Sequence, residues 1–415
     1  MSAARQKTLN TIKTLIDTKH VSVEPDSYAE WISKLDRLAP ELLTTSSISF
    51  QETIHSSLAS LQTSHSAFLK PDEETIPLRH ALCATTRRYS TPDGERWIFQ
   101  DVIQDGPADL AGIRPGDVLI AKDGANISCS DRPLFGFGGT YSLALKSLAG
   151  NEARTVSVNV PNKPAKDRPP MIEPKALSYK IASNQVPVIK ISTFPGAVGL
   201  PFVRELDGVI ARLTAENRDR LIIDLRGNIG GGLASLRLMS YLCPDRRPIG
   251  YSLTKRHLQE GTKPEQLPRI GKLPESKFEQ LAMFVRFRFI HKDRSVVLET
   301  EGLGPRPFHG RIVMVINEHT HSAAEMVAAF AKENHLATLV GTTTAGEVMG
   351  SANFSVGDGY RLRIPVTTWQ TWNGMHIEGR GVEPDIPVDF SPEASEQDRG
   401  PQLNRAMQVA TNFNY

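Results

Sequence analysis

The sequence predicts an α/β fold that follows a helical region and a β-rich region. From about residue 178, apolar runs of strand length alternate with amphipathic helical patterns, which indicates a sheet covered by helices. The runs RLIIDLRG and RIVMVIN are almost continuously apolar, as expected for parallel strands that are buried on both faces. Between about residues 80 and 160, EARTVSVNV instead alternates with period two, which is typical of a half-buried strand.

The elements follow in order along the chain. Helical spacing of apolar residues predicts helices in TLNTIKTLIDTKHV and YAEWISKLDRLAPELL, with a further one in SISFQETIHSSLASLQ. The segments RWIFQDVI and GDVLIAKDG are strand-like, whereas PNKPAKDRPPMIEPK is rich in Pro and Lys and reads as a linker. We therefore expect a helical region at 1–78, a β-rich domain at 79–162, a linker at 163–177, an α/β core at 178–392 and a tail at 393–415.

Composition and charge exclude several classes of protein. The chain has 415 residues, with 48 Lys and Arg against 46 Asp and Glu, so no basic excess indicates nucleic acid as a partner. No run approaches the ~18 apolar residues of a membrane span, and the N-terminus lacks the apolar h-region of a signal peptide, so we expect a cytoplasmic protein. The three cysteines form no CxxC pair, and neither a metal site nor a cofactor is expected.

A glycine-rich stretch, DLRGNIGGG at 224–232, follows one of the buried strands. Glycines permit positive φ angles and a close approach of the backbone to a ligand. No Gly-Lys-Ser/Thr follows, and the glycine spacing is not GxGxxG, so the stretch is not a standard phosphate-binding loop. The motif by itself supports two interpretations about equally: a tight turn, or a loop whose N–H groups face a substrate oxyanion.

Ser322 in HTHSAAEM stands between a predicted strand and a predicted helix. Taken alone, a serine in that place is most often an N-cap. A nucleophile there would gain from the helix dipole and nearby N–H groups, but it needs a base. The adjacent His321 is badly placed to act as that base, and spacing alone selects no partner among the 11 histidines.

Several motifs occur in the order of a known family. GPADLAGIRPGDVLIAKDG at 106–124 resembles the core of a bacterial PDZ domain. Together with VPVIKISTF, LIIDLRGNIGGG, VINEHTHSAAEMVAA, LVGTTTAGE and IEGRGVEPDIPV, it resembles the S41-type C-terminal processing (tail-specific) peptidases. The resemblance covers about residues 60 to 390. It implies an α/β (α+β) serine peptidase core of the ClpP/crotonase-like type, with the β-rich domain inserted as a PDZ-like domain.

The resemblance implies that Ser322 is the nucleophile. In the Ser-Lys branch of the family the base is a lysine 25 residues further on, and here that position is Glu347. No lysine occurs after Lys332. A carboxylate with a pKa near ~4.3 is a poor base for a serine at pH 7, so the Ser-Lys dyad is absent.

The tricorn-like branch of the family uses a serine, a histidine, a second serine and a glutamate. In TSHSAFLKPD, Ser64 and His65 stand where that branch has its second serine and its histidine, and IEGRGVEPDIPV places the glutamate at Glu378. By resemblance, His65 takes the proton of Ser322, Ser64 orients one of them, and Glu378 supports the imidazolium. Glu347 is the second choice for the acid.

The resemblance also implies an oxyanion hole. Its donors would be the amide of Ala323 and a glycine amide from the glycine-rich stretch, either Gly230 or Gly231. The PDZ-like segment departs from the family, because ALCATTRRYSTPDGE lacks the glycines of the usual carboxylate-binding loop.

We therefore expect a serine peptidase that hydrolyses peptides or unfolded polypeptide tails through an acyl-enzyme at Ser322. The alternative is a catalytically inactive relative that binds or sequesters a peptide or an apolar ligand, which the missing lysine favours. The expected partner is a peptide or unfolded polypeptide, without nucleic acid or a membrane span. Homo-oligomer formation is left open.

Overall fold

The computed structural model divides into two compact units. The structure describes residues 2–22, 25–61, 63–70, 75–92, 94–148, 153–164, 171–182, 184–286, 294–304, 307–392 and 400–412. Unit 1 is made of 1–73, 247–299 and 347–378, and unit 2 is made of 74–246, 300–346 and 379–415. In the described ranges, no helix combines the length and the apolar character that crossing a bilayer requires.

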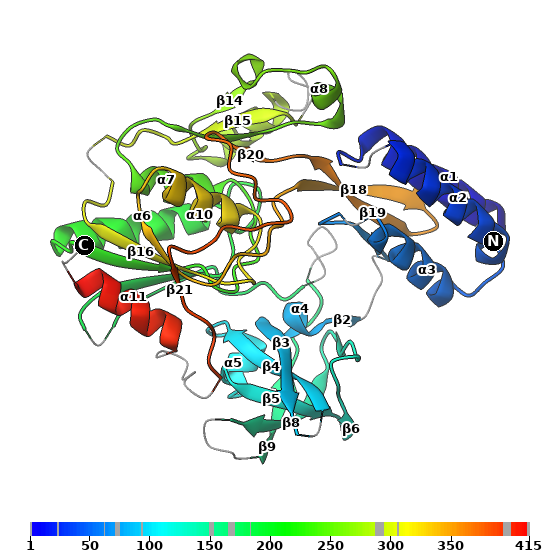
Figure 1. The fold of residues 1–415 in the computed structure, drawn as a ribbon, viewed down its shortest axis with the longest axis horizontal. Helices are drawn as coiled ribbons and strands as arrows, with labels where there is room; N and C mark the ends of the chain where they lie inside the picture. The colour runs from blue at the N-terminus through cyan, green and yellow to red at the C-terminus, as the bar shows by residue number, and fades with distance from the viewer. Residues whose placement is uncertain are drawn as a thin grey trace. The chain divides into compact units, whose positions relative to one another are not determined.

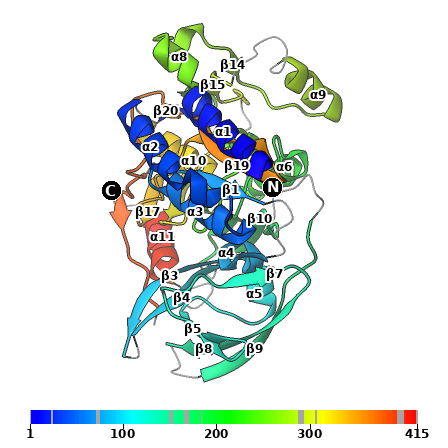
Figure 2. The same cartoon turned by 90° about the vertical axis from the view of Figure 1, so that its right-hand side faces the viewer.

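Unit 1 packs N-terminal helices against a small antiparallel sheet (Figures 1 and 2). The helices are α1 (Ser2–Lys19), α2 (Pro25–Leu42) and α3 (Ser47–Ala59), and the strands, in sheet order, are β1 (Ala67–Leu69), β19 (Tyr360–Thr367) and β18 (Gly350–Gly357). The expected apolar stripes face this sheet, since Ile12, Leu35 and Ile54 are buried in one cluster with Leu362.

A second sheet of unit 1 carries shorter elements. Its order is β14 (Arg269–Ile270), β15 (Val296–Glu299), β13 (Pro248–Ser252) and β20 (Gln370–Thr371). Beside it in the chain are α8 (Lys255–Gln259), the 3-10 turn η1 (Pro264–Gln266) and α9 (Lys277–Val285).

Unit 2 contains the predicted α/β layer. Its six-stranded sheet has the order β10 (Leu177–Ile181), β11 (Pro187–Ile191), β12 (Arg220–Asp224), β16 (Arg311–Ile316), β17 (Thr338–Gly341) and β21 (Ile386–Pro387). The helices α6 (Leu200–Ala215), α7 (Ala234–Leu242) and α10 (Ala323–Glu333) cover one face, and α11 (Pro401–Thr411) covers the other (Figure 1). Residues 401–411, assigned to a tail from the sequence, thus form a helix whose Leu403 and Val409 pack on the sheet.

The order of these strands brings the two motifs of interest together. All pairings from β11 to β21 are parallel, so the strands end at the same edge of the sheet. β12 and β16 are direct neighbours, with Asp224 opposite Val315. The glycine-rich loop after β12 and the segment after β16 therefore emerge side by side, which is where α/β sheets commonly bind ligands.

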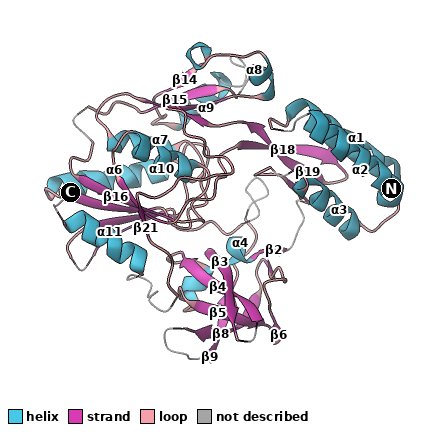
Figure 3. Cartoon of the chain, viewed as in Figure 1, coloured by secondary structure: helices cyan, strands magenta, loops and turns pink. Residues whose placement is uncertain are grey.

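The remaining part of unit 2 is a β-rich subdomain, residues 74–160, built mainly of strands (Figure 3). Its main sheet has the order β3 (Ala84–Thr91), β4 (Gly94–Val102), β5 (Asp117–Lys122), β8 (Thr140–Ser147) and β9 (Ala153–Asn159), with β6 (Ala125–Asn126) on β5. The pair β2 (Thr75–Pro77) and β7 (Leu134–Gly136) and the helices α4 (Leu78–Leu82) and α5 (Pro107–Leu110) complete it.

Candidate active site

Ser322 occupies a strained turn between β16 and α10. Its backbone angles are φ 53° and ψ −119°, a conformation that residues other than glycine rarely adopt. Such a conformation costs about 1–3 kcal/mol and persists only where the surrounding structure enforces it. Strain of this kind clusters at functional sites, and here it falls on the predicted nucleophile.

The start of α10 is closed by a buried glutamate that the sequence analysis did not single out. Glu325 Oε2 accepts the Ser322 amide at 3.0 Å, and the Glu325 amide donates to the Ser322 carbonyl oxygen at 2.8 Å. Glu325 Oε1 also accepts the Thr344 hydroxyl and the Gly346 amide, both at 2.6 Å. The cap thus uses the backbone of Ser322 together with the carboxylate of Glu325.

The glycine-rich loop lies directly against Ser322. A Cβ at Gly230 would stand 2.7 Å from the Ser322 Cβ and 2.9 Å from the His321 carbonyl oxygen, so a larger residue does not fit there. The Gly230 amide is not directed at a substrate, because it donates to Asn228 Oδ1 at 2.8 Å. Asn228 in turn donates to the Ile191 carbonyl oxygen at 2.9 Å, which ties the loop to β11.

The other two amides predicted as oxyanion donors are those of Gly231 and Ala323. Gly231 forms a parallel bridge with Phe194, whose hydrogen bonds are made by the Gly230 carbonyl and the Gly232 amide, each at 2.8 Å. In this parallel pairing the Gly231 amide makes neither of the two hydrogen bonds of the bridge. Ala323 is the first residue of α10, where helix geometry gives an N–H group no partner within the helix.

Ser64 and His65 form a turn in unit 1, just before β1. The His65 Nδ1 and the Ser64 Oγ are 3.0 Å apart, and His65 also has a positive φ of 61°. Beneath the turn, the Thr63 hydroxyl lies 3.2 Å from Nε2 of the fully buried His20. The Ser22 amide donates to His20 Nδ1 at 3.4 Å, which leaves Nε2 as the protonated nitrogen of a neutral ring.

The burial of His20 predicts acid sensitivity of unit 1. Burial, with the nearby charge of Lys255, lowers the pKa of His20 from 6.5 to about 4. Between those values the unfolded chain binds a proton that the folded chain does not, so stability falls as the pH is lowered from 6.5 to 4. The loss should reach roughly 3 kcal/mol. Urea titrations at pH 7.5, 6 and 4.5 should show it, and His20→Gln should flatten the dependence. An equally steep dependence in His20→Gln would contradict this explanation.

The two candidate acids also lie in unit 1. Glu378 Oε2 accepts the amides of Val348 at 2.9 Å and of Met349 at 3.2 Å. Glu378 therefore fixes the segment that directly follows Glu347, so both candidates belong to one local cluster.

The predicted residues accordingly fall into two sets. Ser322, Ala323, Gly230 and Gly231 are brought together within unit 2, as described above. Ser64, His65, Glu347 and Glu378 belong to unit 1, where Ser64 contacts His65. Their roles as a catalytic group stay predictions.

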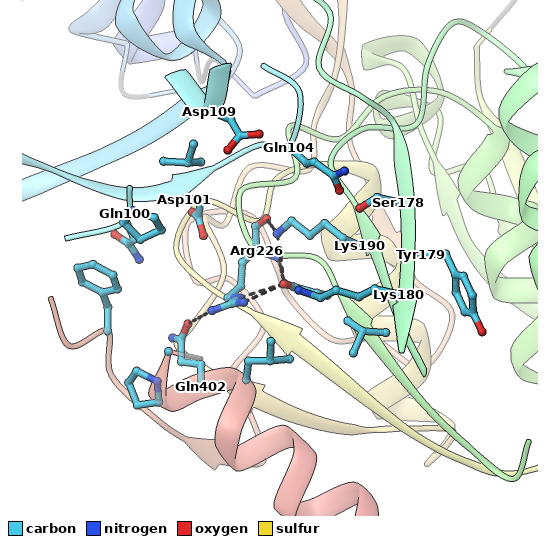
Figure 4. A pocket seen from close by; sticks show the side chains of 18 residues that line it. Gln100, Asp101, Gln104, Asp109, Ser178, Tyr179, Lys180, Lys190, Arg226 and Gln402 are labelled. Carbon is cyan, nitrogen blue, oxygen red and sulfur yellow. Dashed lines mark hydrogen bonds and ion pairs between the residues drawn. The ribbon is translucent and has the colours of Figure 1, made fainter. Parts of the chain in front are cut away.

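A buried cluster of charges lies at the start of the glycine-rich loop and lines a cavity of about 410 Å³ (Figure 4). Asp224 accepts hydrogen bonds from Arg226 at 3.0 and 2.8 Å and from Lys190 at 3.2 Å. Burial alone would raise the pKa of Asp224, but the charges of Arg226 and Lys190 outweigh it and hold that pKa well below its usual range. Burial lowers the pKa of Lys190, against the attraction of Asp224.

The β-rich subdomain touches the segment that leads to Ser322. Arg79 donates to His321 Nε2 at 2.8 Å, so this nitrogen of His321 acts as an acceptor and is not available as a base. Gln100 Nε2 donates to Glu318 Oε1 at 3.1 Å. Burial lowers the pKa of His319, which lies in the same segment.

Comparisons with known proteins identify the α/β region. Residues 185–388 match the model of peptidase family S41. The chain contains a peptidase family S41 domain. It is 26% identical over 388 residues to carboxyl-terminal-processing peptidase 1, chloroplastic, of Arabidopsis thaliana, an alignment that covers 89% of this chain and 68% of that relative. It is 24% identical over 303 residues to the carboxy-terminal processing protease CtpA of Bacillus subtilis (strain 168), covering 72% of this chain and 54% of the relative.

Solved structures agree with the S41 fold. The photosystem II D1 C-terminal processing protease superposes with a TM-score of 0.58 at 17% identity, covering 100% of this chain and 98% of that one. Mature CPAF gives a TM-score of 0.55 at 17% identity, covering 98% and 96%. The predicted fold class is thus confirmed. The predicted enzyme class, a serine peptidase hydrolase, is confirmed at the level of the family. The chain spans about half the length of the bacterial relative.

The predicted cytoplasmic location is wrong. The prediction rested on the lack of an apolar h-region near residue 1. The Arabidopsis relative, however, is named as chloroplastic, and the fold is shared with a protease that processes the photosystem II D1 protein. The character of this N-terminal stretch therefore does not assign a compartment.

Three residues that shape the candidate site were not predicted from the sequence, namely Glu325, Asn228 and Asn317. Glu325 had a readable signal, since Ser322 and Glu325 have the S-x-x-E spacing of a capping box. Asn228 and Asn317 follow β12 and β16 and hold loop amides through their side chains. Asparagine after a strand is common in turns, so neither residue stands out in the sequence.

Proposed function

We propose that the chain is an active serine peptidase that hydrolyses peptides or unfolded polypeptide tails through an acyl-enzyme at Ser322. The observation that carries the proposal is the strained turn at Ser322. The turn sets this serine at the N-terminus of a buried helix, against a glycine that has no room for a side chain. A simple helix cap needs neither the strain nor the close glycine.

The proposed chemistry uses a nucleophile, a base and two amide donors. His65 takes the proton of Ser322 as Oγ attacks the substrate carbonyl, and the amides of Gly231 and Ala323 hold the resulting oxyanion. His65 then delivers the proton to the leaving amine, and a water activated by the same ring hydrolyses the acyl-enzyme. Ser64 is proposed to orient His65, with which it shares a hydrogen bond at 3.0 Å. Glu378 is proposed to support the imidazolium.

The finer assignments are part of the same proposal. The Ser64-His65 pair and the missing lysine support the tricorn-like branch, and the β-rich subdomain is proposed to be PDZ-like. The named action of the Arabidopsis and Bacillus relatives, carboxy-terminal processing, supports unfolded polypeptide tails as the substrate class.

An active-site serine probe tests the proposal directly. A fluorophosphonate should label the wild-type chain at Ser322, as located by peptide mass spectrometry, and Ser322→Ala should not be labelled. Ser235→Ala, which removes another buried serine of unit 2, is the matched control and should label normally. Absence of labelling in a folded wild-type chain would overturn the proposal and favour the binding protein that the missing lysine suggested.

A further inference from the structure

A carboxylate of the β-rich subdomain is bound to the turn that carries the proposed nucleophile. Asp101, on β4, is 8% exposed, and its two oxygens accept Asn317 Nδ2 at 3.2 and 2.9 Å. The Thr85 hydroxyl donates to Asp101 Oδ2 at 2.6 Å, and the Asp101 amide donates to the Thr85 hydroxyl oxygen at 3.1 Å. The carboxylate is therefore held in one orientation from its own sheet.

Asn317 connects Asp101 to both loops of the proposed site. Its Oδ1 accepts the amides of Gly227 and His319, each at 3.1 Å. Gly227 opens the loop that supplies Gly231, and His319 lies three residues before Ser322. The Asp101 side chain also covers Gly227 itself, where a Cβ would stand 3.0 Å from the Asp101 Cβ.

The direction of these hydrogen bonds fixes the orientation of Asn317. An amide side chain has one accepting end and one donating end. A carboxylate oxygen accepts hydrogen bonds, so Asp101 holds the Asn317 nitrogen toward itself and leaves the Asn317 oxygen facing Gly227 and His319. A flipped Asn317 would face both loop amides with N–H groups and would release the two loops from each other.

We propose that Asp101 is a positioning residue that, through Asn317, sets the spacing between the nucleophile turn and the oxyanion loop. The role rests on the peptidase function proposed above. It makes the β-rich subdomain a fixed part of the catalytic framework of unit 2, whatever else the subdomain binds.

The first test separates positioning from stability. Asp101→Ala should lower kcat by about tenfold to a hundredfold and leave KM within about twofold, because misplaced oxyanion donors are felt in the transition state. The control is Asp117→Ala, which removes a carboxylate of the same subdomain that is 1% exposed and pairs with Arg154, away from the turn. It should lower the melting temperature but leave kcat unchanged well below that temperature.

The second test is an exchange of the two side chains. Asn317→Asp alone places two carboxylates together and should abolish activity at pH 7. The double variant Asp101→Asn with Asn317→Asp restores a donor opposite an acceptor and should recover at least tenfold in kcat over Asn317→Asp. An active wild type with unchanged kcat in Asp101→Ala, or an exchange without recovery in a folded chain, would overturn the inference alone. A wild type that neither turns over peptide nor reacts with the probe would overturn the proposed function instead.

Discussion

Replacing either Ser322 or His65 with alanine is expected to reduce peptidase activity by at least ~10⁴-fold, without loss of the fold. The serine hydroxyl is a weak nucleophile until a base removes its proton, so each residue is of little use without the other. The double variant Ser322→Ala with His65→Ala should therefore be about as active as either single variant. Turnover of an unstructured peptide, followed by mass spectrometry, measures all three.

Matched controls keep this result specific. His55→Ala removes a different histidine of unit 1, on α3, and should retain activity. The strained backbone at residue 322 remains in Ser322→Ala, so circular dichroism and the urea midpoint should stay close to wild type. Activity of His65→Ala near the wild-type level would mean that another group acts as the base.

The same assay separates the two candidate acids. Glu347→Gln should be mild, whereas Glu378→Gln should lower kcat strongly and shift the acidic limb of the pH–rate profile. Glu378 also accepts the Val348 and Met349 amides, so its glutamine variant is compared with Met349→Ala, which disturbs the same segment without removing a charge. If Glu347→Gln is as inactive as His65→Ala, Glu347 is the acid.

The α/β layer could be predicted because its signals are local. β12, β16 and α10 each appear in the sequence as an apolar run or a helical stripe, and parallel pairing then places their loops together. The identity of the oxyanion donors could not be predicted at this level. Gly230 and Gly231 look alike in sequence, and only the Asn228 side chain, which takes the Gly230 amide, distinguishes them.

Polar contacts between residues far apart in the chain could not be predicted from the sequence. Asp101 and Asn317 are separated by more than 200 residues, and neither stands in a motif that implies the other. Such contacts depend on the packed fold rather than on local pattern.

The buried cluster at the start of the glycine-rich loop is expected to dominate the stability of the α/β layer. In Asp224→Asn the charge is lost but the shape is kept, which leaves Lys190 and Arg226 without their shared carboxylate. The side chains of Asp224, Arg226 and Lys190 are 7%, 17% and 21% exposed, so water replaces little of that interaction. Breaking a buried pair in this way should cost about 3–5 kcal/mol at pH 7. Hydrogen exchange of β12 and β16 in a urea series would measure it.

The pH dependence of that loss identifies its cause. Without Asp224, burial should lower the pKa of Lys190 further, so the folded variant releases a proton that the unfolded chain keeps. The stability of Asp224→Asn should then rise with pH and approach the wild type toward about pH 10, because the unfolded state binds more protons. Glu216→Gln, at the exposed Arg212–Glu216 pair, should show neither the loss nor the recovery. A deficit in Asp224→Asn that is constant across pH would instead assign the effect to the lost hydrogen bonds from Arg226, because these do not depend on the charge of Lys190.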